Sequence, residues 1–327
     1  MSGAVICDVQ SLTVAYHSGE AWLQAVRDVS FEIRSGEILA IVGETGSGKS
    51  TTASAMIRML PRNGRVQSGH VFFAGEDLLR LSDRAMRRLR GQDIAYVPQQ
   101  PMSAFNPTMT VGRQVAEPLL IHRGMSYREA APQAAKRLTE MGVHEVERVM
   151  RAYPHELSGG MLQRAMIASA MICQPRLLIA DEPTSALDVT IQRQILDLIK
   201  QVQLEYHLAV VLISHDLTVV SQIADRILVL YGGRAAEIGP TGAVVRHSRH
   251  PYTKGLLRST LTSDLTHKAK LTSLSGYPPN PLEVDQEPGC PFEPRCDRSV
   301  ADCSVAFPER TQDADHAWAC YNPEPAA

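Results

Sequence analysis

A glycine-rich segment directly after an apolar run is the feature that most constrains this chain. Residues 43–50 read Gly-Glu-Thr-Gly-Ser-Gly-Lys-Ser and fit the pattern G-x-x-x-x-G-K-[ST]. They follow the apolar residues 38–42, typical of a strand buried on both faces, and precede a predicted helix over 52–60 that Pro61 ends. A strand, a loop and a helix in this order turn backbone N–H groups toward a bound phosphate. The sequence therefore predicts a nucleotide-binding α/β fold, whereas a chance glycine-rich turn would not explain the flanking elements.

The whole loop is expected to contact the nucleotide. Glycines let the backbone bend, Lys49 should reach the β- and γ-phosphates, and the hydroxyl of Ser50 should ligate Mg²⁺. The predicted nucleotide-binding residues of this segment are Gly43, Glu44, Thr45, Gly46, Ser47, Gly48, Lys49, Ser50 and Thr51.

A second apolar run, residues 177–180, ends in two carboxylates. Asp181 stands where a strand-end acid holds Mg²⁺ through its water shell, and Glu182 could polarise the attacking water as a general base. Alone, the pair could be only an acidic exit from a strand, followed by Pro183. Beside a phosphate loop, we interpret it as the hydrolytic pair.

The remaining pattern alternates strands and helices. Residues 5–9, 12–16 and 29–33 predict short antiparallel strands, 190–206 a helix, and 209–213 another buried strand. This order predicts a parallel α/β core with an antiparallel part.

Charge and hydropathy exclude two classes of protein. The formal net charge is −2, which argues against a nucleic-acid partner. We find no uncharged apolar run of 18 or more residues and no signal-peptide pattern at the N-terminus. We therefore expect a cytoplasmic chain that a partner would hold at any membrane where it works.

The cysteines fall into two groups. Cys7 and Cys173 lie in apolar stretches and are expected to be buried thiols. The other four follow the spacing C-x5-C-x6-C-x16-C and are Cys290, Cys296, Cys303 and Cys320. In a cytosolic chain such a group predicts a metal or iron–sulfur site before disulfides, with zinc, whose cysteine pairs are usually closer, and free thiols as alternatives.

The segment 157–164, Leu-Ser-Gly-Gly-Met-Leu-Gln-Arg, resembles the signature of the ATP-binding cassette (ABC) family, with Met161 where Gln is usual. The resemblance covers residues 5 to about 240. It implies an ABC ATPase: a P-loop NTPase domain with a mixed sheet core, a helical subdomain and an antiparallel β subdomain. It also implies that Ser158, Gly159 and Gly160 hold the γ-phosphate of an ATP bound to a second cassette.

The same resemblance assigns four further roles. Tyr16 matches the aromatic residue that stacks on adenine, although an ordinary strand aromatic is the alternative. Gln99 matches the Q-loop glutamine that senses Mg²⁺ and the attacking water, and His215 the switch histidine on the γ-phosphate. Residues 185–188, including Asp188, match the D-loop along the dimer seam.

Four other segments are similar to the oligopeptide/dipeptide importer branch of the family: 101–107, 153–157, 250–253 and 289–296. This similarity implies a bacterial peptide importer subunit at the cytoplasmic face of the inner or plasma membrane. The implied partners are a second, paralogous ABC ATPase in a heterodimer, two integral-membrane permease subunits and an extracytoplasmic solute-binding protein, with no nucleic acid. It further implies that the four-cysteine tail holds a [4Fe–4S] cluster, with Zn²⁺ as the alternative.

The expected domains are 1–255, the nucleotide-binding domain with a helical subdomain at about 100–165, and 256–327, a small C-terminal domain that carries the four cysteines. Import of a metal chelate or an opine, or a soluble non-transport ABC ATPase, are the alternative functions. Repair ATPases carry a long coiled-coil insertion and translation ATPases carry two cassettes; this chain has one cassette and no such insertion.

Overall fold

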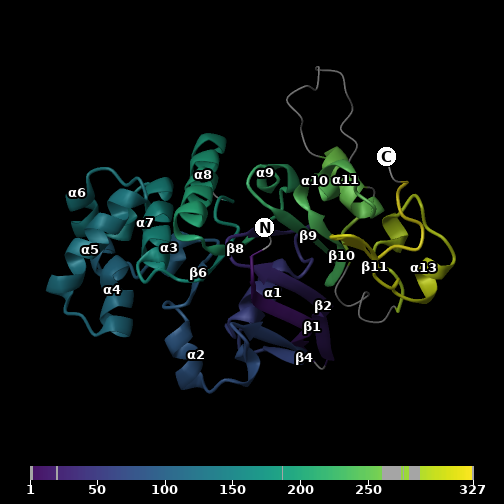
Figure 1. Cartoon of the computed structure of the whole chain (residues 1–327), viewed down its shortest axis with the longest axis horizontal. Coiled ribbons are helices and arrows are strands. Elements are labelled where there is room, and N and C mark those ends of the chain that lie inside the picture. Colours follow the sequence, from purple (N-terminus) through teal and green to yellow (C-terminus); the bar gives the residue numbers. More distant parts are fainter. Residues whose placement is uncertain are drawn as a thin grey trace. The chain divides into compact units, whose positions relative to one another are not determined.

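The computed structural model describes residues 3–19, 21–185, 187–259, 274, 276–279 and 288–325 (Figure 1). The chain divides into two compact units. The first is built mainly from residues 80–213, and the second from residues 7–32, 38–79 and 214–327.

The second unit contains a four-stranded antiparallel sheet in the order β2-β1-β4-β5. Its strands are β1 (Val5–Ser18), β2 (Ala21–Arg34), β4 (Gly64–Phe73) and β5 (Glu76–Asp77). The antiparallel part predicted from the N-terminal sequence is therefore present, and Figure 1 shows β1, β2 and β4 as one layer.

The two short strands predicted at 5–9 and 12–16 form the single strand β1, so the predicted break between them is wrong. Ser11 adopts a positive φ of 46°, and the register with β4 shifts between Gln10 and Thr13. This irregularity interrupts the alternation of side chains without ending the strand.

The second unit also carries the strand order β11-β12-β10-β9-β3. The buried strand β3 pairs in parallel with β9, and β9 pairs antiparallel with β10. The bounds in this unit are β3 (Ile38–Val42), β9 (Arg226–Tyr231), β10 (Arg234–Pro240), β11 (Thr311–Asp313), β12 (His316–Trp318), α1 (Lys49–Met56), α9 (Leu217–Val220), α10 (Thr241–Arg246), α11 (Pro251–Ser259), α13 (Asp302–Val305) and the 3₁₀ turns η1 (Leu78–Arg80) and η3 (Glu293–Arg295).

The first unit combines three parallel strands with a group of helices. The strands run in the order β8-β7-β6, and residues 177–181 of β7 are all buried. The helices α4, α5, α6 and α7 pack against one another (Figure 1). The bounds are β6 (Ile94–Val97), β7 (Leu177–Asp181), β8 (Ala209–Ser214), α2 (Asp83–Leu89), α3 (Pro101–Ala104), α4 (Val111–Arg123), α5 (Tyr127–Glu140), α6 (Val146–Arg151), η2 (Pro154–Glu156), α7 (Gly159–Met171) and α8 (Val189–Tyr206).

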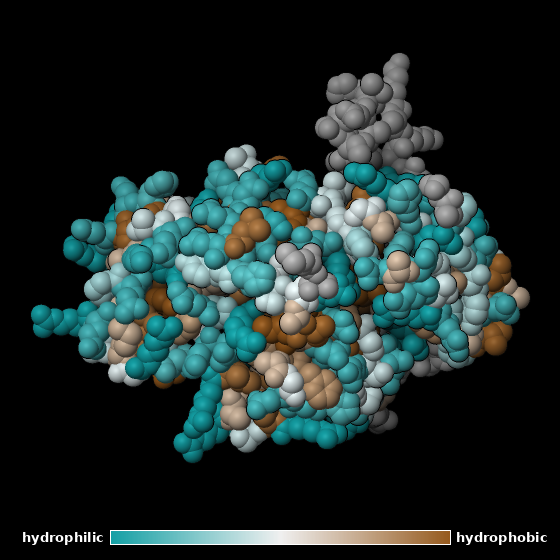
Figure 2. Space-filling view, in the orientation of Figure 1, coloured by the Kyte–Doolittle hydropathy of each residue, from teal (hydrophilic) through white to brown (hydrophobic). Residues whose placement is uncertain are grey.

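The predicted fold class, a P-loop α/β fold with mixed strands and helical parts, is confirmed. Over the described ranges, no helix combines the length and the apolar composition that a membrane span requires. On the face seen in Figure 2, hydrophobic residues occur in small groups within a mostly hydrophilic surface.

Candidate active site

The loop between β3 and α1 has the geometry of a phosphate cradle. Gly46 and Gly48 adopt positive φ angles of 84° and 97°, and Gly48 caps α1. A Cβ atom at Gly43 would lie 2.2 Å from the carbonyl oxygen of Leu230, and one at Gly48 would lie 2.5 Å from that of Ala25. No larger residue fits at these two positions, so the loop backbone is fixed by its neighbours.

Two polar side chains of the loop are buried within it. The Nζ atom of Lys49 donates hydrogen bonds to the carbonyl oxygens of Gly43 at 2.7 Å and Glu44 at 2.9 Å. The Oγ atom of Ser47 is buried and has no hydrogen-bond partner within the described part of the chain. An unpartnered buried hydroxyl is costly, and a phosphate oxygen is a suitable acceptor for it.

The rest of the loop faces outward at the start of α1. Thr45, Gly46 and Ser50 are exposed, so the hydroxyl expected to ligate Mg²⁺ is accessible. Tyr16 of β1 is half-buried, and its hydroxyl shares a hydrogen bond of 3.2 Å with that of Thr51. The structure thus brings the predicted adenine-stacking residue beside the phosphate loop.

His215 belongs to the same unit as the phosphate loop. It is exposed and directly follows β8, before the short helix α9. Two hydrogen bonds from its chain neighbours hold the turn that contains His215. Asp216 caps α9 by accepting from the N–H of Val219 at 3.0 Å, and Ser214 Oγ accepts from the N–H of Asp216 at 3.0 Å.

The first unit brings together the residues predicted for hydrolysis. Asp181, at the end of β7, is 4% exposed and accepts a hydrogen bond of 3.0 Å from the hydroxyl of Tyr96. Glu182 follows and accepts a hydrogen bond of 2.9 Å from Nε2 of Gln99. Glu182 has a positive φ of 45°, a strained conformation that its N–H hydrogen bond to the carbonyl of Ile213 supports. Strain held in this way is common where side chains are aimed at a reaction.

The signature and the D-loop share one hollow in the same unit. Ser158 caps α7, and its Oγ accepts from the N–H of Met161 at 3.4 Å; Asp188 caps α8, accepting from the N–H of Ile191 at 3.0 Å. A cavity of about 610 Å³ is lined by both caps and by Gly159 and Gly160. Of the predicted D-loop, Ala186 lies outside the described residues.

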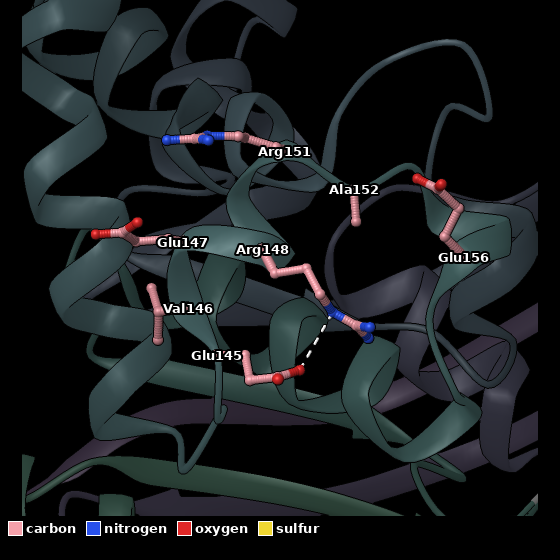
Figure 3. Close-up of a pocket in the computed structure, with 7 residues that line it drawn as sticks. All are labelled: Glu145, Val146, Glu147, Arg148, Arg151, Ala152 and Glu156. Carbon is pink, nitrogen blue, oxygen red and sulfur yellow. Dashed lines mark ion pairs between the residues drawn. The ribbon is translucent and has the colours of Figure 1, made fainter.

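A second hollow opens next to α6, with a volume of about 810 Å³ (Figure 3). Its lining is mainly charged and consists of Glu145, Val146, Glu147, Arg148, Arg151, Ala152 and Glu156. The ion pair drawn in Figure 3 joins Arg148 Nε to Glu145 Oε2 at 3.3 Å. This surface precedes the signature in the chain.

The four tail cysteines lie near one another, and none forms a disulfide. The N–H of Cys290 donates to the carbonyl of Cys303 at 2.7 Å. Burial raises the pKa of the Cys290 thiol to about 12, and the nearby thiols of Cys303, Cys320 and Cys296 add to the increase. Burial likewise raises the pKa of Cys320 to about 11, with contributions from Cys296 and Cys303. A bound cation would reverse these shifts by favouring the thiolates.

These thiols are neighbours without forming a ready metal site. Over the described ranges, no group of three or more His, Cys, Asp or Glu side chains is arranged to hold a metal ion. Thiol donors as such suit iron or zinc. As predicted, Cys7 and Cys173 are buried, and burial raises the pKa of both thiols.

Two hydroxyls at these sites were not predicted from the sequence. Tyr96 holds Asp181, and Tyr252 of α11 accepts a hydrogen bond of 2.8 Å from the N–H of Glu44. Tyr96 could have been found from its place at the end of a strand adjacent to β7. Tyr252 lies 208 residues from Glu44 in the chain, and no local pattern connects them.

Comparison with known families gives two matches along the chain. Residues 26–185 match the family described as ABC transporter. Residues 236–303 match the family described as oligopeptide/dipeptide transporter, C-terminal region.

Individual relatives align over almost the whole chain. The dipeptide transport ATP-binding protein DppD of Bacillus subtilis is 45% identical over 97% of this chain and 94% of its own length. The oligopeptide transport ATP-binding protein OppD of Salmonella typhimurium is 42% identical over 98% of this chain and 94% of its own length. Among solved structures, the dimeric structure of MJ0796, described as a bacterial ABC transporter cassette, has a TM-score of 0.66 at 30% identity and covers 72% of this chain and 99% of that one.

Proposed function

This chain belongs to the family of ABC transporter ATP-binding proteins and is an ATPase, and we propose that it powers a bacterial importer of di- and oligopeptides. The observation that carries the enzymatic part is the pair Gln99–Glu182 beside the Tyr96-held Asp181, on a chain with an intact phosphate loop. The printed functions of the relatives, dipeptide and oligopeptide transport, support the choice of solute class.

We propose that residues 43–51 bind ATP, with Lys49 leaving its loop carbonyls for the β- and γ-phosphate oxygens. Ser47 Oγ gains the acceptor it lacks within the described structure, and Tyr16 stacks on adenine. Ser50, Gln99 and Asp181 are the residues that would hold Mg²⁺, and the ion would neutralise charge on the phosphates.

In the proposed hydrolysis step, Glu182 accepts a proton from a water molecule that Gln99 helps to orient. The water oxygen forms a bond to the γ-phosphorus while the bond from that phosphorus to the β,γ-bridging oxygen breaks, and ADP leaves with the electron pair. His215 donates a hydrogen bond to the γ-phosphate. The products are ADP, inorganic phosphate and the proton held by Glu182.

A complete ATP site in this proposal combines the phosphate loop of one cassette with the signature of another, so it requires a second cassette. We propose that the surface formed by Ser158, Gly159, Gly160 and Asp188 faces ATP bound to a paralogous ATPase chain, in a heterodimer. The shared cavity of the two helix caps is the feature that supports this role. ATP binding would join the cassettes and hydrolysis would release them, which gives the two states that a transport cycle needs.

The remaining partners follow from the proposed transport role. Two permease subunits would hold the chain at the cytoplasmic face of the inner or plasma membrane, and an extracytoplasmic solute-binding protein would deliver the peptide. The charged hollow beside α6 (Figure 3) is a suitable contact for a permease, because it lies in the predicted helical subdomain, residues 100–165.

We propose a C-terminal domain, residues 256–327, in which Cys290, Cys296, Cys303 and Cys320 hold a [4Fe–4S] cluster, with Zn²⁺ as the alternative. Iron and sulfide analysis of anaerobically purified protein tests this. Cys303→Ser should lose most of the iron, whereas Cys173→Ser, which changes a buried thiol outside the group, should keep it. Stoichiometric zinc without iron would favour the alternative, and absence of both metals from the wild type would refute the site.

The transport function is tested by peptide uptake into proteoliposomes that contain the assembled transporter, with ATP enclosed on the cassette side and the binding protein outside. We expect ATP-dependent uptake of a di- or oligopeptide. Uptake of an opine or a metal chelate instead would replace the solute class. A complex that hydrolyses ATP and moves no solute would favour a non-transport ATPase.

A further inference from the structure

The cysteine-bearing tail makes a direct ionic contact with the phosphate loop. Arg295, next to Cys296 in the chain, donates from Nη1 to Glu44 Oε2 at 2.6 Å and from Nη2 to Glu44 Oε1 at 3.1 Å. The side chain of Arg295 is 6% exposed and that of Glu44 is 24% exposed. A two-bond, largely buried pair of this kind fixes both the position and the orientation of the carboxylate.

Other hydrogen bonds hold the same two residues in place. Arg295 Nη1 also donates to the hydroxyl of Tyr231, at the end of β9, at 3.0 Å. The hydroxyl of Tyr252 accepts from the N–H of Glu44 at 2.8 Å. Both ends of Glu44, its backbone and its carboxylate, are therefore held by residues outside the loop.

An aromatic cluster joins the tail to these tyrosines. The ring centroids of Tyr231 and Tyr252 are 4.4 Å apart, and Phe292 of the tail lies 5.1 Å from the first and 5.4 Å from the second. Phe292 is 3% exposed. Its burial anchors the segment that carries Arg295.

The turn between β9 and β10 lies between the tail and the phosphate loop and contacts both. A Cβ atom at Gly232 would lie 2.7 Å from Cβ of the tail residue Pro291. The next residue, Gly233, donates its N–H to the carbonyl oxygen of Ser47 at 3.2 Å. The tail thus contacts the phosphate loop directly through Arg295 and indirectly through this turn.

We propose that Arg295 is a positioning residue for ATP, acting through Glu44. Its guanidinium holds the Glu44 carboxylate, so that this negative charge is neutralised beside a ligand that itself carries several negative charges. The inference rests on the proposed role of residues 43–51 in ATP binding. It makes the cysteine-bearing segment part of the nucleotide site rather than a separate appendage.

The proposal predicts a definite sign for each substitution. In Arg295→Gln, the Glu44 carboxylate loses its partner beside the phosphates and repels them, so ATP affinity falls by about tenfold. In the double variant Arg295→Gln with Glu44→Gln, the repelling charge is gone and most of the affinity returns. A tail that only anchors the fold would not give this rescue.

The test measures equilibrium binding of ATP with Mg²⁺ to the assembled transporter, in a Glu182→Gln background that prevents turnover. Arg295→Lys, which keeps the charge and loses the second hydrogen bond, should fall between wild type and Arg295→Gln. Arg298→Gln is the matched control, because Arg298 lies in the same tail and donates to Asn322 and to the carbonyl of Pro323. The control should bind ATP as the wild type does.

Three results would overturn the inference: unchanged affinity in Arg295→Gln, no rescue in the double variant, or an equal loss in Arg298→Gln. If Arg295→Gln does not fold, the single variant Glu44→Gln tests the proposal instead. It should bind ATP a few-fold more tightly than the parent, and weaker binding would contradict the proposal. If the parent complex does not bind ATP, and Lys49→Ala leaves its ATP binding unchanged, the result would instead refute the proposed function on which the inference rests.

Discussion

At the scale of single residues, His250 is wholly buried, and its Nδ1 accepts a hydrogen bond of 3.1 Å from the N–H of Tyr252. Burial lowers the pKa of His250 to about 4, while the buried carboxylate of Glu237 acts in the opposite direction. Glu237 itself accepts from the N–H groups of Arg249 and His250 and is hydrogen-bonded to His316. Between pH 6.5 and 4, His250 binds a proton in the unfolded chain but stays neutral in the folded one. The free energy of unfolding is therefore highest above pH 6.5 and falls as the pH drops through this range.

We therefore predict that His250→Asn makes the protein less sensitive to acid. Asn keeps an acceptor for the N–H of Tyr252 and has no charge to gain. Between pH 7 and 4 the wild type should lose up to roughly 3 kcal/mol more unfolding free energy than the variant. Denaturant midpoints over this pH range measure the difference, and parallel pH profiles would show that His250 is not responsible.

Tyr16 gives a second prediction at this scale. If its ring stacks on adenine, Tyr16→Ala should weaken ATP binding by about tenfold, as loss of one base–aromatic stack does. Tyr16→Phe, which loses only the hydrogen bond to Thr51, should bind nearly as tightly as the wild type. Titration of both variants with ATP checks this, and equal losses in the two would assign the effect to the hydroxyl.

The sequence indicated candidate site residues, but it did not indicate the residues that hold them. Lys49, Asp181 and Glu182 stand in local patterns set by their chemistry. The Tyr96–Asp181 contact joins residues 85 apart in the chain, and the Arg295–Glu44 contact joins residues 251 apart. Such pairs depend on strand order and on the path of the tail, which no local pattern specifies.

At the scale of elements, the serine that caps a helix can belong to the predicted signature or can be an ordinary structural cap. Ser158 caps α7, and Ser126 caps α5 in a capping box with Glu129, whose carboxylate accepts from the N–H of Ser126 at 2.8 Å. The two serines share a stabilising role, and only one lies in the predicted ATP-binding set.

We predict that Ser158→Ala and Ser126→Ala each lower stability by about 1 kcal/mol, since each removes an N-cap. Only Ser158→Ala should slow ATP hydrolysis, by more than about tenfold. Thermal unfolding and turnover of the assembled complex, measured side by side, separate the two effects. Equal turnover in both variants would reduce Ser158 to a structural cap.

Element types were predictable wherever a pattern was long or fully buried. The helix predicted at 190–206 is α8 (Val189–Tyr206), and the run 209–213 is β8. The boundaries of elements were harder to predict: the helix predicted at 52–60 is α1 (Lys49–Met56), because Gly48 caps it earlier and the backbone leaves helical geometry at Ile57. The bulge in β1 likewise depends on one residue with positive φ, Ser11.

At the scale of the whole molecule, the chain has one phosphate loop and one signature, each within its own compact unit. The resemblance of the ordered motifs to the ABC family predicted the ABC fold, which is confirmed, whereas the pairing with a second cassette stays a prediction. The domain border at residue 255 stays a prediction, and it precedes the undescribed residues 260–273. Composition indicated a distinct tail, while the packing of Phe292 against Tyr252 and the ion pair of Arg295 with Glu44 were visible only in the structure.

The central claim, that this chain hydrolyses ATP to drive a membrane partner, is tested most directly by ATP turnover of the co-expressed transporter, wild type against Glu182→Gln. The account predicts turnover that rises with peptide and binding protein and falls by about 10²- to 10⁴-fold in the variant, because the general base is lost while ATP still binds. Turnover that persists in Glu182→Gln would contradict it, and would place the active hydrolytic site on the partner cassette.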